Sequence, residues 1–304
     1  MRLAWRVSVA CGLLGAIVLA SDAGATAARL RGASPEWLAA CATFLAVQTM
    51  LMALRWRATA ASLGLAMSVR RAVGEYFLAQ LVNMTVPGGV IGDVVRAVRT
   101  GPRREAAAHA VIVERAAGQV FMAVLAGTGA VVGLAMGRLP AALGWSVIGV
   151  LTAGVLAAAL AMRASWKPLG RLVGAARVAL LARGAWPLQA GLGVAIAGLN
   201  TAAFWAAARA TGTALTLEEA LAVVPLILAA MVVPATVGGW GWREGAAAAL
   251  FPIAGASAAG GVAAGVAFGL VLTAVSLPAV IWLIVERGAT TRDLPRADAV
   301  RSSD

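Results

Sequence analysis

The chain has few of the residues that build metal sites and nucleophilic active sites. Its 304 residues include one histidine, His109, and two cysteines. A lone histidine cannot form a metal site, and no serine–histidine arrangement or nucleotide-binding loop is present. Cys11 and Cys41 both fall in apolar stretches, where a free cysteine behaves as a small hydrophobic side chain. We therefore assign no catalytic residues, no metal and no cofactor.

Acidic residues are also scarce. Thirteen Asp and Glu stand against 25 basic residues, all arginine except Lys167, and the formal net charge is +12. In a soluble protein this excess would suggest nucleic-acid binding. Here the arginines cluster between apolar stretches and no basic domain stands apart. We therefore expect membrane lipid as the partner, and no nucleic acid.

The abundant residues are those of a polytopic all-α membrane protein. Hydrophobic residues make up 61% of the chain, and the mean hydropathy is +0.88. A helix needs roughly 20 apolar residues to cross a bilayer. On this basis we predict about six spans, at 5–21, 36–54, 109–136, 141–162, 185–208 and 256–286. The transmembrane domain would cover 1–287, and 288–304 would form a disordered cytoplasmic tail.

The first apolar stretch has two interpretations. The segment 1–6 is basic and Ala25-Thr26-Ala27 resembles a cleavage site, so a signal peptide is one alternative. We expect it to be retained as a short span, because polytopic proteins commonly begin this way.

Two shorter apolar segments end at proline–glycine breaks. Segment 72–86 runs into Pro87, and segment 217–233 runs into Pro234. Both are too short to cross comfortably, so we predict two re-entrant helical hairpins. Matching breaks in two halves of a membrane protein indicate a transport-type binding site and a possible inverted repeat. The break residues are Asn83, Pro87, Gly88, Gly89 and Gly92 in the first hairpin, and Pro234, Gly238, Gly239 and Gly241 in the second.

The arginine distribution predicts the orientation. If the N-terminus is cytoplasmic, 19 of the 25 basic residues fall on the cytoplasmic side and four fall outside. The positive-inside rule therefore predicts that both termini are cytoplasmic. The first hairpin would then open from the cytoplasm and the second from outside.

Acid–arginine combinations follow the first break. Asp93 and Arg96 are three residues apart and would share one helical face. Glu114 and Arg115 are adjacent, so each needs a partner elsewhere: Arg115 could meet Asp93 or a phosphate, and Glu114 could meet Arg96. Charges at membrane depth are costly and are usually functional. The structural alternatives are a local ion pair and an interfacial pair whose side chains reach water.

A similar combination, Arg243 and Glu244, follows the second break between Trp240 and Trp242. We interpret it as a second phosphate contact, with a tryptophan belt at the outer interface as the structural alternative. The predicted lipid-phosphate-binding residues are Arg96, Arg115 and Arg243. Their supporting charges are Asp93, Glu114 and Glu244.

Taken in order, these motifs resemble those of the lysylphosphatidylglycerol synthase transmembrane family, also called flippase-like domain proteins. The matching motifs are Leu54-Arg55-Trp56-Arg57, Asn83…Pro87-Gly88-Gly89…Gly92-Asp93…Arg96, Glu114-Arg115 and Pro234…Gly238-Gly239-Trp240-Gly241-Trp242-Arg243-Glu244-Gly245. The resemblance implies a bacterial inner-membrane protein that handles a lipid. The soluble aminoacyl-transferring domain of multidomain relatives is missing, so we expect a stand-alone member that does not itself make lysylphosphatidylglycerol.

The leading functional hypothesis is translocation of an anionic phospholipid or a polyprenyl-linked lipid. One alternative is an intramembrane transferase acting on a lipid phosphate, with Asp93 or Glu114 as the base. Another is an accessory scaffold that delivers lipid to a partner lipid-modifying enzyme. The sequence leaves open whether the protein forms a homo-oligomer.

Overall fold

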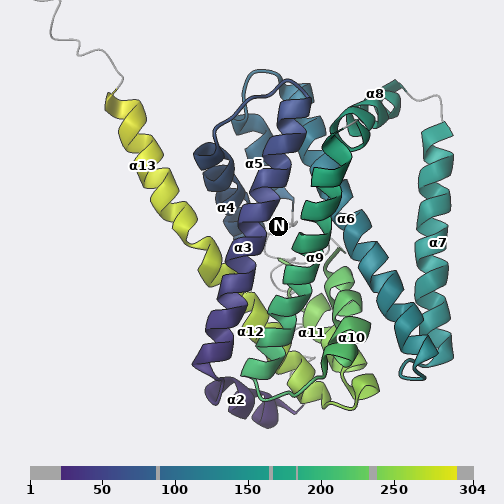
Figure 1. Cartoon of the computed structure of the whole chain (residues 1–304). Helices are drawn as coiled ribbons and strands as arrows, with labels where there is room; N and C mark the ends of the chain where they lie inside the picture. The colour runs from purple at the N-terminus through teal and green to yellow at the C-terminus, as the bar shows by residue number, and fades with distance from the viewer. Residues whose placement is uncertain (1–21, 87–89, 164–166, 183, 233–237, 293–304) are drawn as a thin grey trace, which may run out of the picture.

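The computed structural model describes residues 22–86, 90–163, 167–182, 184–232 and 238–292, and within these ranges all regular structure is helical (Figure 1). Five stretches are long and apolar enough to cross a membrane: Pro35–Ser62, Arg104–Ala135, Ala141–Leu160, Ala185–Ala210 and Ala258–Glu286. They coincide with five of the six predicted spans and confirm the fold class. The predicted span 5–21 and residues 293–304 of the predicted tail lie outside the described residues.

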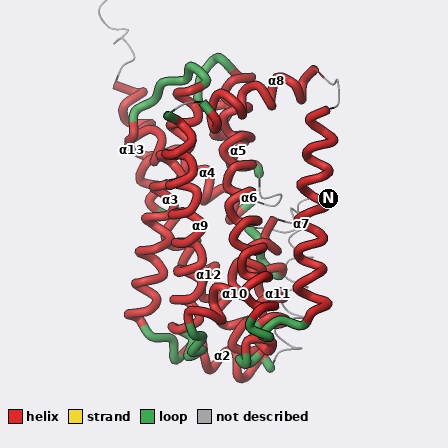
Figure 2. The backbone as a smooth tube through the Cα atoms, turned by 45° about the vertical axis from the view of Figure 1, so that its right-hand side comes forward, coloured by secondary structure: helices red, strands yellow, loops and turns green. Residues whose placement is uncertain are grey.

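The long helices lie side by side along one direction (Figure 2). They are α3 (Pro35–Ser62), α6 (Arg104–Ala135), α7 (Ala141–Arg163), α9 (Ala185–Ala210) and α12 (Ala258–Ser276), the last continued by α13 (Pro278–Arg292). The predicted span 256–286 therefore consists of two consecutive helices, α12 and α13. Pro278 begins a new helix because proline has no N–H with which to continue the preceding hydrogen-bond ladder. From this point α13 leans away from the bundle (Figure 1).

Hydroxyl side chains mark where several helices begin. Ser34 accepts a hydrogen bond from Trp37 N at the start of α3, and Ser257 accepts one from Gly260 N at the start of α12. Each side chain satisfies a backbone donor that has no partner inside the helix. Short α2 (Ala23–Arg31) precedes α3 at the same end of the bundle.

The two predicted hairpins are present, and they enter from opposite ends. α4 (Val69–Thr85) and α5 (Ile91–Arg99) form the first. α10 (Leu217–Ala229), a 3₁₀ turn at Ala230–Val232 and α11 (Trp242–Leu250) form the second. A Cβ at Gly238 would lie 3.0 Å from the Met84 side chain, so residues that border the two breaks are in contact. Pro87, Gly88, Gly89 and Pro234 lie outside the described residues.

The element order shows an inverted repeat. The series α3, α4, α5, α6 recurs as α9, α10, α11, α12 with the direction reversed (Figure 1). α3 and α9 pack against each other, α4 packs against α12 and α13, and α10 packs against α6. Each hairpin is therefore held by the last long helix of the other half.

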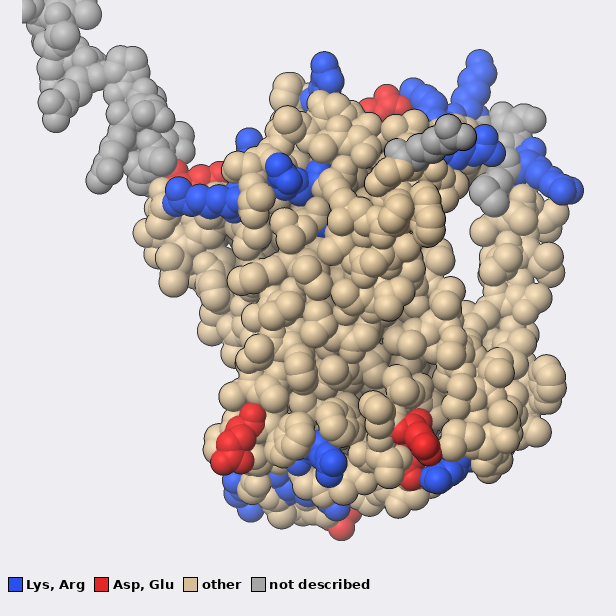
Figure 3. Space-filling view, viewed as in Figure 1, with Lys and Arg blue, Asp and Glu red and all other residues tan. Residues whose placement is uncertain are grey.

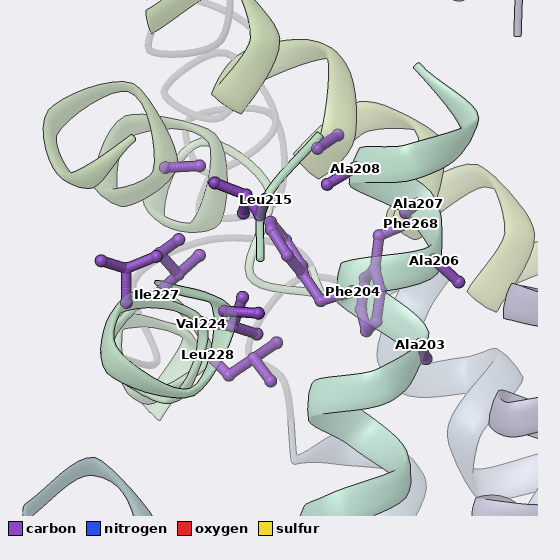
Figure 4. Packing of buried hydrophobic residues seen from close by; sticks show 14 of the residues in the cluster. Ala203, Phe204, Ala206, Ala207, Ala208, Leu215, Val224, Ile227, Leu228 and Phe268 are labelled. Atoms are coloured by element: carbon purple, nitrogen blue, oxygen red, sulfur yellow. The ribbon is translucent and has the colours of Figure 1, made fainter. Parts of the chain in front are cut away.

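A core of aromatic and small side chains supports the second hairpin. Phe204 of α9 lies 5.4 Å from Phe268 of α12 and 6.3 Å from Phe251, measured between ring centroids. Figure 4 shows this pair beside Val224, Ile227 and Leu228 of α10. Alanines at 203 and 206–208 are fully buried, and such small residues let membrane helices approach closely.

On the face shown in Figure 3, charged side chains gather at the two ends of the bundle and are few between them. We call the end where α3 ends and α4 begins the arginine-rich end. It carries Arg57, Arg70, Arg71, Arg99, Arg103, Arg104, Arg163, Lys167 and Arg171. Helix α8 (Lys167–Ala176) lies there, followed by a π-helical turn at Arg177–Leu181. Figure 3 also shows an opening between α7 and the rest of the bundle.

Candidate lipid head-group site

A cavity of about 240 Å³ lies where the two hairpin breaks meet. Asn83 and Met84 of α4 and Asp93 of α5 line it from the first hairpin. Met231, Gly238 and Gly239 line it from the second. The long helices complete the wall with Gln48, Met52, Arg55, Glu114, Arg115, Gly118 and Asn200, among others. Irregular backbone at membrane depth is tolerated where it lines such a cavity.

Asn83 connects the two arms of the first hairpin. Its side-chain oxygen accepts a hydrogen bond of 2.8 Å from Gly92 N, and its side-chain nitrogen donates to Asp93 Oδ2 over 3.2 Å. The arms are close because position 92 has no side chain: a Cβ there would lie 2.0 Å from the Ala79 carbonyl oxygen. The amide and the glycine together fix the position of the Asp93 carboxylate.

Ion pairs join three helices beside the cavity. Arg96 donates to Asp93 over 2.9 Å and to Glu114 over 3.3 Å. Arg55 of α3 donates to Glu114 of α6 over 2.7 Å, and Arg115 pairs with Asp93. The pairings predicted for Arg115 with Asp93 and for Glu114 with Arg96 are both present. We call these five residues the central charge cluster.

Arg96 is the most enclosed cation of the central charge cluster. Its guanidinium carbon lies 4.6 Å from the Trp56 ring centroid and 4.3 Å from that of Tyr76. Such cation–π contacts stabilise a desolvated guanidinium. The Tyr76 hydroxyl also donates to Glu114 over 3.3 Å. Arg96 does not line the cavity, and it holds the two carboxylates in place from behind.

The cations that line the cavity are Arg55 and Arg115. Arg55 is 1% exposed, yet its Nε and Nη1 have no hydrogen-bond partner within the described residues. Arg115 keeps 40% of its side-chain surface accessible. Three guanidinium groups and two carboxylates leave the central charge cluster with a formal charge of +1. Buried charge without compensation is costly, so this arrangement favours an anion in the cavity.

The charged residues of the second hairpin are paired in a different way. Arg243 and Glu244 are both fully buried and pair with each other. Glu244 also accepts a hydrogen bond from Gly241 N over 2.6 Å. The Arg243 guanidinium lies 4.9 Å from the Trp240 ring centroid and 5.4 Å from that of Phe268. Neither charged residue lines the cavity, and the pair is formally neutral.

The structure thus separates the six charged residues singled out from the sequence. Asp93, Glu114 and Arg115 line the cavity, Arg96 lies behind them, and Arg243 and Glu244 are closed off by aromatic rings. Trp242 is 39% exposed, whereas Trp240 packs on Arg243, so the two tryptophans do not form one belt.

Sequence reasoning missed Arg55 as a site residue. The predicted span ended at residue 54, which placed this arginine in a cytoplasmic segment. Helix α3 instead continues to Ser62, and Arg55 is compensated by Glu114 inside the bundle. Its place in the Leu54–Arg57 motif was the available signal. Asn200 of α9, which is not among the predicted site residues, also lines the cavity.

The fold and the cavity define a class: a helical membrane protein with two opposed re-entrant hairpins around a charged pocket. Within that class, the chain belongs to the family described as "Lysylphosphatidylglycerol synthase TM region", whose model matches residues 3–279. This result confirms the resemblance carried by the motifs. No curated protein matches the chain.

Proposed function

We propose that this protein moves the head group of an anionic phospholipid or a polyprenyl-linked lipid across the membrane. One observation carries the proposal: the central charge cluster has a net charge of +1, and its two cavity-lining cations, Arg55 and Arg115, have nitrogens without a hydrogen-bond partner among the described residues. A phosphodiester carries one negative charge, so it would neutralise the cluster. Guanidinium groups suit phosphate oxygens because they donate in a planar fork.

The two hairpins would give access to the cavity from the two faces of the membrane. Because they enter from opposite ends, moving one or the other would open the cavity to a different face of the membrane. Asp93 and Glu114 would hold the arginines in place when no lipid is bound. The acyl chains would stay in the bilayer while the head group crosses.

The arginine-rich end gives the expected orientation in a bacterial inner membrane. By the positive-inside rule this end faces the cytoplasm, and both termini lie on that side. The first hairpin then opens from the cytoplasm and the second from the opposite face.

The intramembrane transferase is the weaker alternative. A general base needs a carboxylate oxygen free to accept a proton from the substrate. Asp93 accepts hydrogen bonds from Arg96, Arg115 and Asn83, and Glu114 accepts them from Arg55, Arg96 and Tyr76. Each oxygen of both acids therefore already accepts at least one hydrogen bond, which favours a supporting role.

The test is translocation in proteoliposomes. Fluorescent short-chain phosphatidylglycerol would be incorporated, and the fraction protected from dithionite would be followed over time, with a fluorescent polyprenyl phosphate in a parallel series. We expect the purified protein to accelerate loss of protection for one probe. Arg115→Gln should slow it about tenfold or more, since a hydrogen bond to a charged group contributes about 1.5–3 kcal/mol.

The matched control is Arg138→Gln. Arg138 pairs with Glu219 at the end of the bundle, with 49% of its side chain exposed, far from the cavity. We expect this variant to translocate at the wild-type rate. Proteoliposomes that behave like protein-free liposomes with both probes would overturn the proposed function.

A further inference from the structure

A second, larger groove lies on the lipid-facing side of the first hairpin. Its volume is about 790 Å³, and α3, α4, α12 and α13 form its walls. The lining is almost entirely apolar, with Ala46 and Met50 from α3, Phe77 from α4, and Val275 and Ile281 from α12 and α13. The groove exists because α13 leans away from α3 after Pro278 (Figure 1).

One cation, Arg70, lies at the arginine-rich end of this groove. Its guanidinium carbon is 5.7 Å from the Trp282 ring centroid. Trp282 itself lies on the α4 backbone: a Cβ at Gly74 would be 2.2 Å from the indole. Arg70 is exposed and forms no ion pair within the described ranges, whereas nearby Arg99 pairs with Glu75 and Glu286. Arg70 therefore offers a positive charge at the mouth of an apolar groove.

We propose that this groove binds an acyl chain of an anionic glycerophospholipid, with the lipid phosphate on Arg70. The apolar lining of the groove suits a hydrocarbon chain, and a single cation at its mouth suits a phosphate. The site shares no lining residue with the central cavity, and it binds an acyl chain as well as the phosphate. The inference does not depend on translocation.

A seam of three hydrogen-bonded side chains divides the groove from the central cavity. Gln80 accepts from Thr49 over 3.2 Å and donates to Ser276 over 3.0 Å. On α4, Gln80 lines the cavity, whereas Phe77, one turn earlier, lines the groove. A lipid in the groove thus lies one helical turn from the central cavity.

The test is photolabelling of the full chain in phosphatidylcholine nanodiscs. The probe is phosphatidylglycerol with a diazirine in the middle of one acyl chain, and labelled peptides are mapped by mass spectrometry. We expect adducts to concentrate at Met50, Phe77 and Ile281. Ala46→Trp would fill the groove and lower this labelling at least fivefold. Val47→Trp is the control, because Val47 is exposed on the same helix and does not line the groove.

Arg70→Gln tests recognition of the phosphate. An arginine near an anionic lipid contributes about 1 kcal/mol, so labelling by the phosphatidylglycerol probe should fall about fivefold. Labelling by the matching phosphatidylcholine probe should fall by less, because its choline cation offsets the charge of its phosphate. Arg104→Gln removes an exposed charge at the same end outside the groove, and we expect it to have no effect.

Three results would overturn the inference. They are labelling spread evenly over the lipid-facing helices, labelling unaffected by Ala46→Trp, and equal loss of both probes in Arg70→Gln. Arg115→Gln separates this proposal from the proposed function, since it should leave groove labelling unchanged while it slows translocation.

Discussion

The two hairpins share an architecture but differ in how their charges are paired. In each hairpin the second helix carries an acid as its third residue, Asp93 in α5 and Glu244 in α11. In the first hairpin the acid accepts from arginines on two helices, α5 and α6, beside the cavity. In the second it pairs only with the adjacent Arg243, within a shell of aromatic rings. One motif can therefore produce a ligand-facing cluster or a closed structural pair.

The difference depends on the neighbouring helices. An acid near a helix N-terminus is favoured in both hairpins, because it interacts with unpaired backbone N–H groups. Glu244 makes such an interaction directly, because its carboxylate accepts a hydrogen bond from Gly241 N. Asp93 is held by the Asn83 side chain, which leaves its oxygens oriented toward arginines. The acid of the first hairpin consequently depends on partners in other helices, whereas the acid of the second hairpin is paired mostly by residues of its own hairpin.

The largest expected effect is a loss of stability. Its absence would contradict the difference in charge pairing between the two hairpins. Glu114→Gln removes the carboxylate that Arg55 and Arg96 share. Loss of one partner from a buried pair costs about 3–5 kcal/mol. We expect a loss of this size in the free energy of unfolding, measured by titration with a denaturing detergent. Glu244→Gln should cost a similar amount.

Rescue by a second substitution distinguishes the hairpins. Arg243→Met combined with Glu244→Gln leaves no charge in the second pair, and such replacements are often neutral. This double variant should recover most of the stability that Glu244→Gln alone loses. Arg55→Met combined with Glu114→Gln still leaves Arg96 without its Glu114 contact, so recovery should be incomplete. Equal rescue in both hairpins would contradict the distinction.

The next largest effect concerns close packing at a glycine, which occurs at both hairpins. Gly92→Ala would place a Cβ 2.0 Å from the Ala79 carbonyl oxygen, and Gly261→Ala would place one 2.4 Å from that of Ala247. Overpacking costs about 1–3 kcal/mol, so both variants should lower the unfolding midpoint in detergent. Gly198→Ala is the control because nothing lies within 4 Å of its Cβ. A tolerated Gly92→Ala would show that the two arms are less closely packed than described.

The smallest effect is a pH dependence at the end of the second hairpin. The backbone N–H of Thr216, the Thr216 hydroxyl and Arg138 lower the pKa of Glu219 from its ordinary value. A lowered pKa contributes stability above the unfolded-state value of about 4.3, which is lost as pH falls through the folded-state value. Glu219→Gln retains the capping geometry, so it should cost at most about 1 kcal/mol at pH 7.

Unfolding midpoints of wild type and Glu219→Gln, measured in steps from pH 7 into the acid range, test this prediction. The difference between them should shrink as the pH falls through the folded-state pKa of Glu219. A difference that stays constant over the whole range would indicate that the charge is not responsible.

Local sequence features were sufficient for much of the fold. Length and apolarity predicted five spans, and proline–glycine breaks predicted both hairpins. The three-residue spacing of Asp93 and Arg96 predicted their shared face. These inferences succeed because helix length and helical periodicity depend on nearby residues.

Long-range partners were harder to predict. Hydropathy ended the second span before Arg55, because a charge is compatible with a buried helix only if its partner is known. That partner, Glu114, is 59 residues away. Similarly, nothing near Arg243 in sequence indicates that Phe268 of α12 lies over its guanidinium.

The absence of a side chain at two positions has an evolutionary consequence. A Cβ at Gly118 would lie 2.8 Å from Arg55 Nη2, and one at Gly269 would lie 2.3 Å from Arg243 Nη2. Each buried arginine therefore occupies the space of a missing methyl group on a neighbouring helix. Substituting the glycine alone displaces the arginine, and replacing the arginine with a smaller residue leaves a void. In related proteins the two members of each pair should therefore change together, and ancestors that lost only one should be rare.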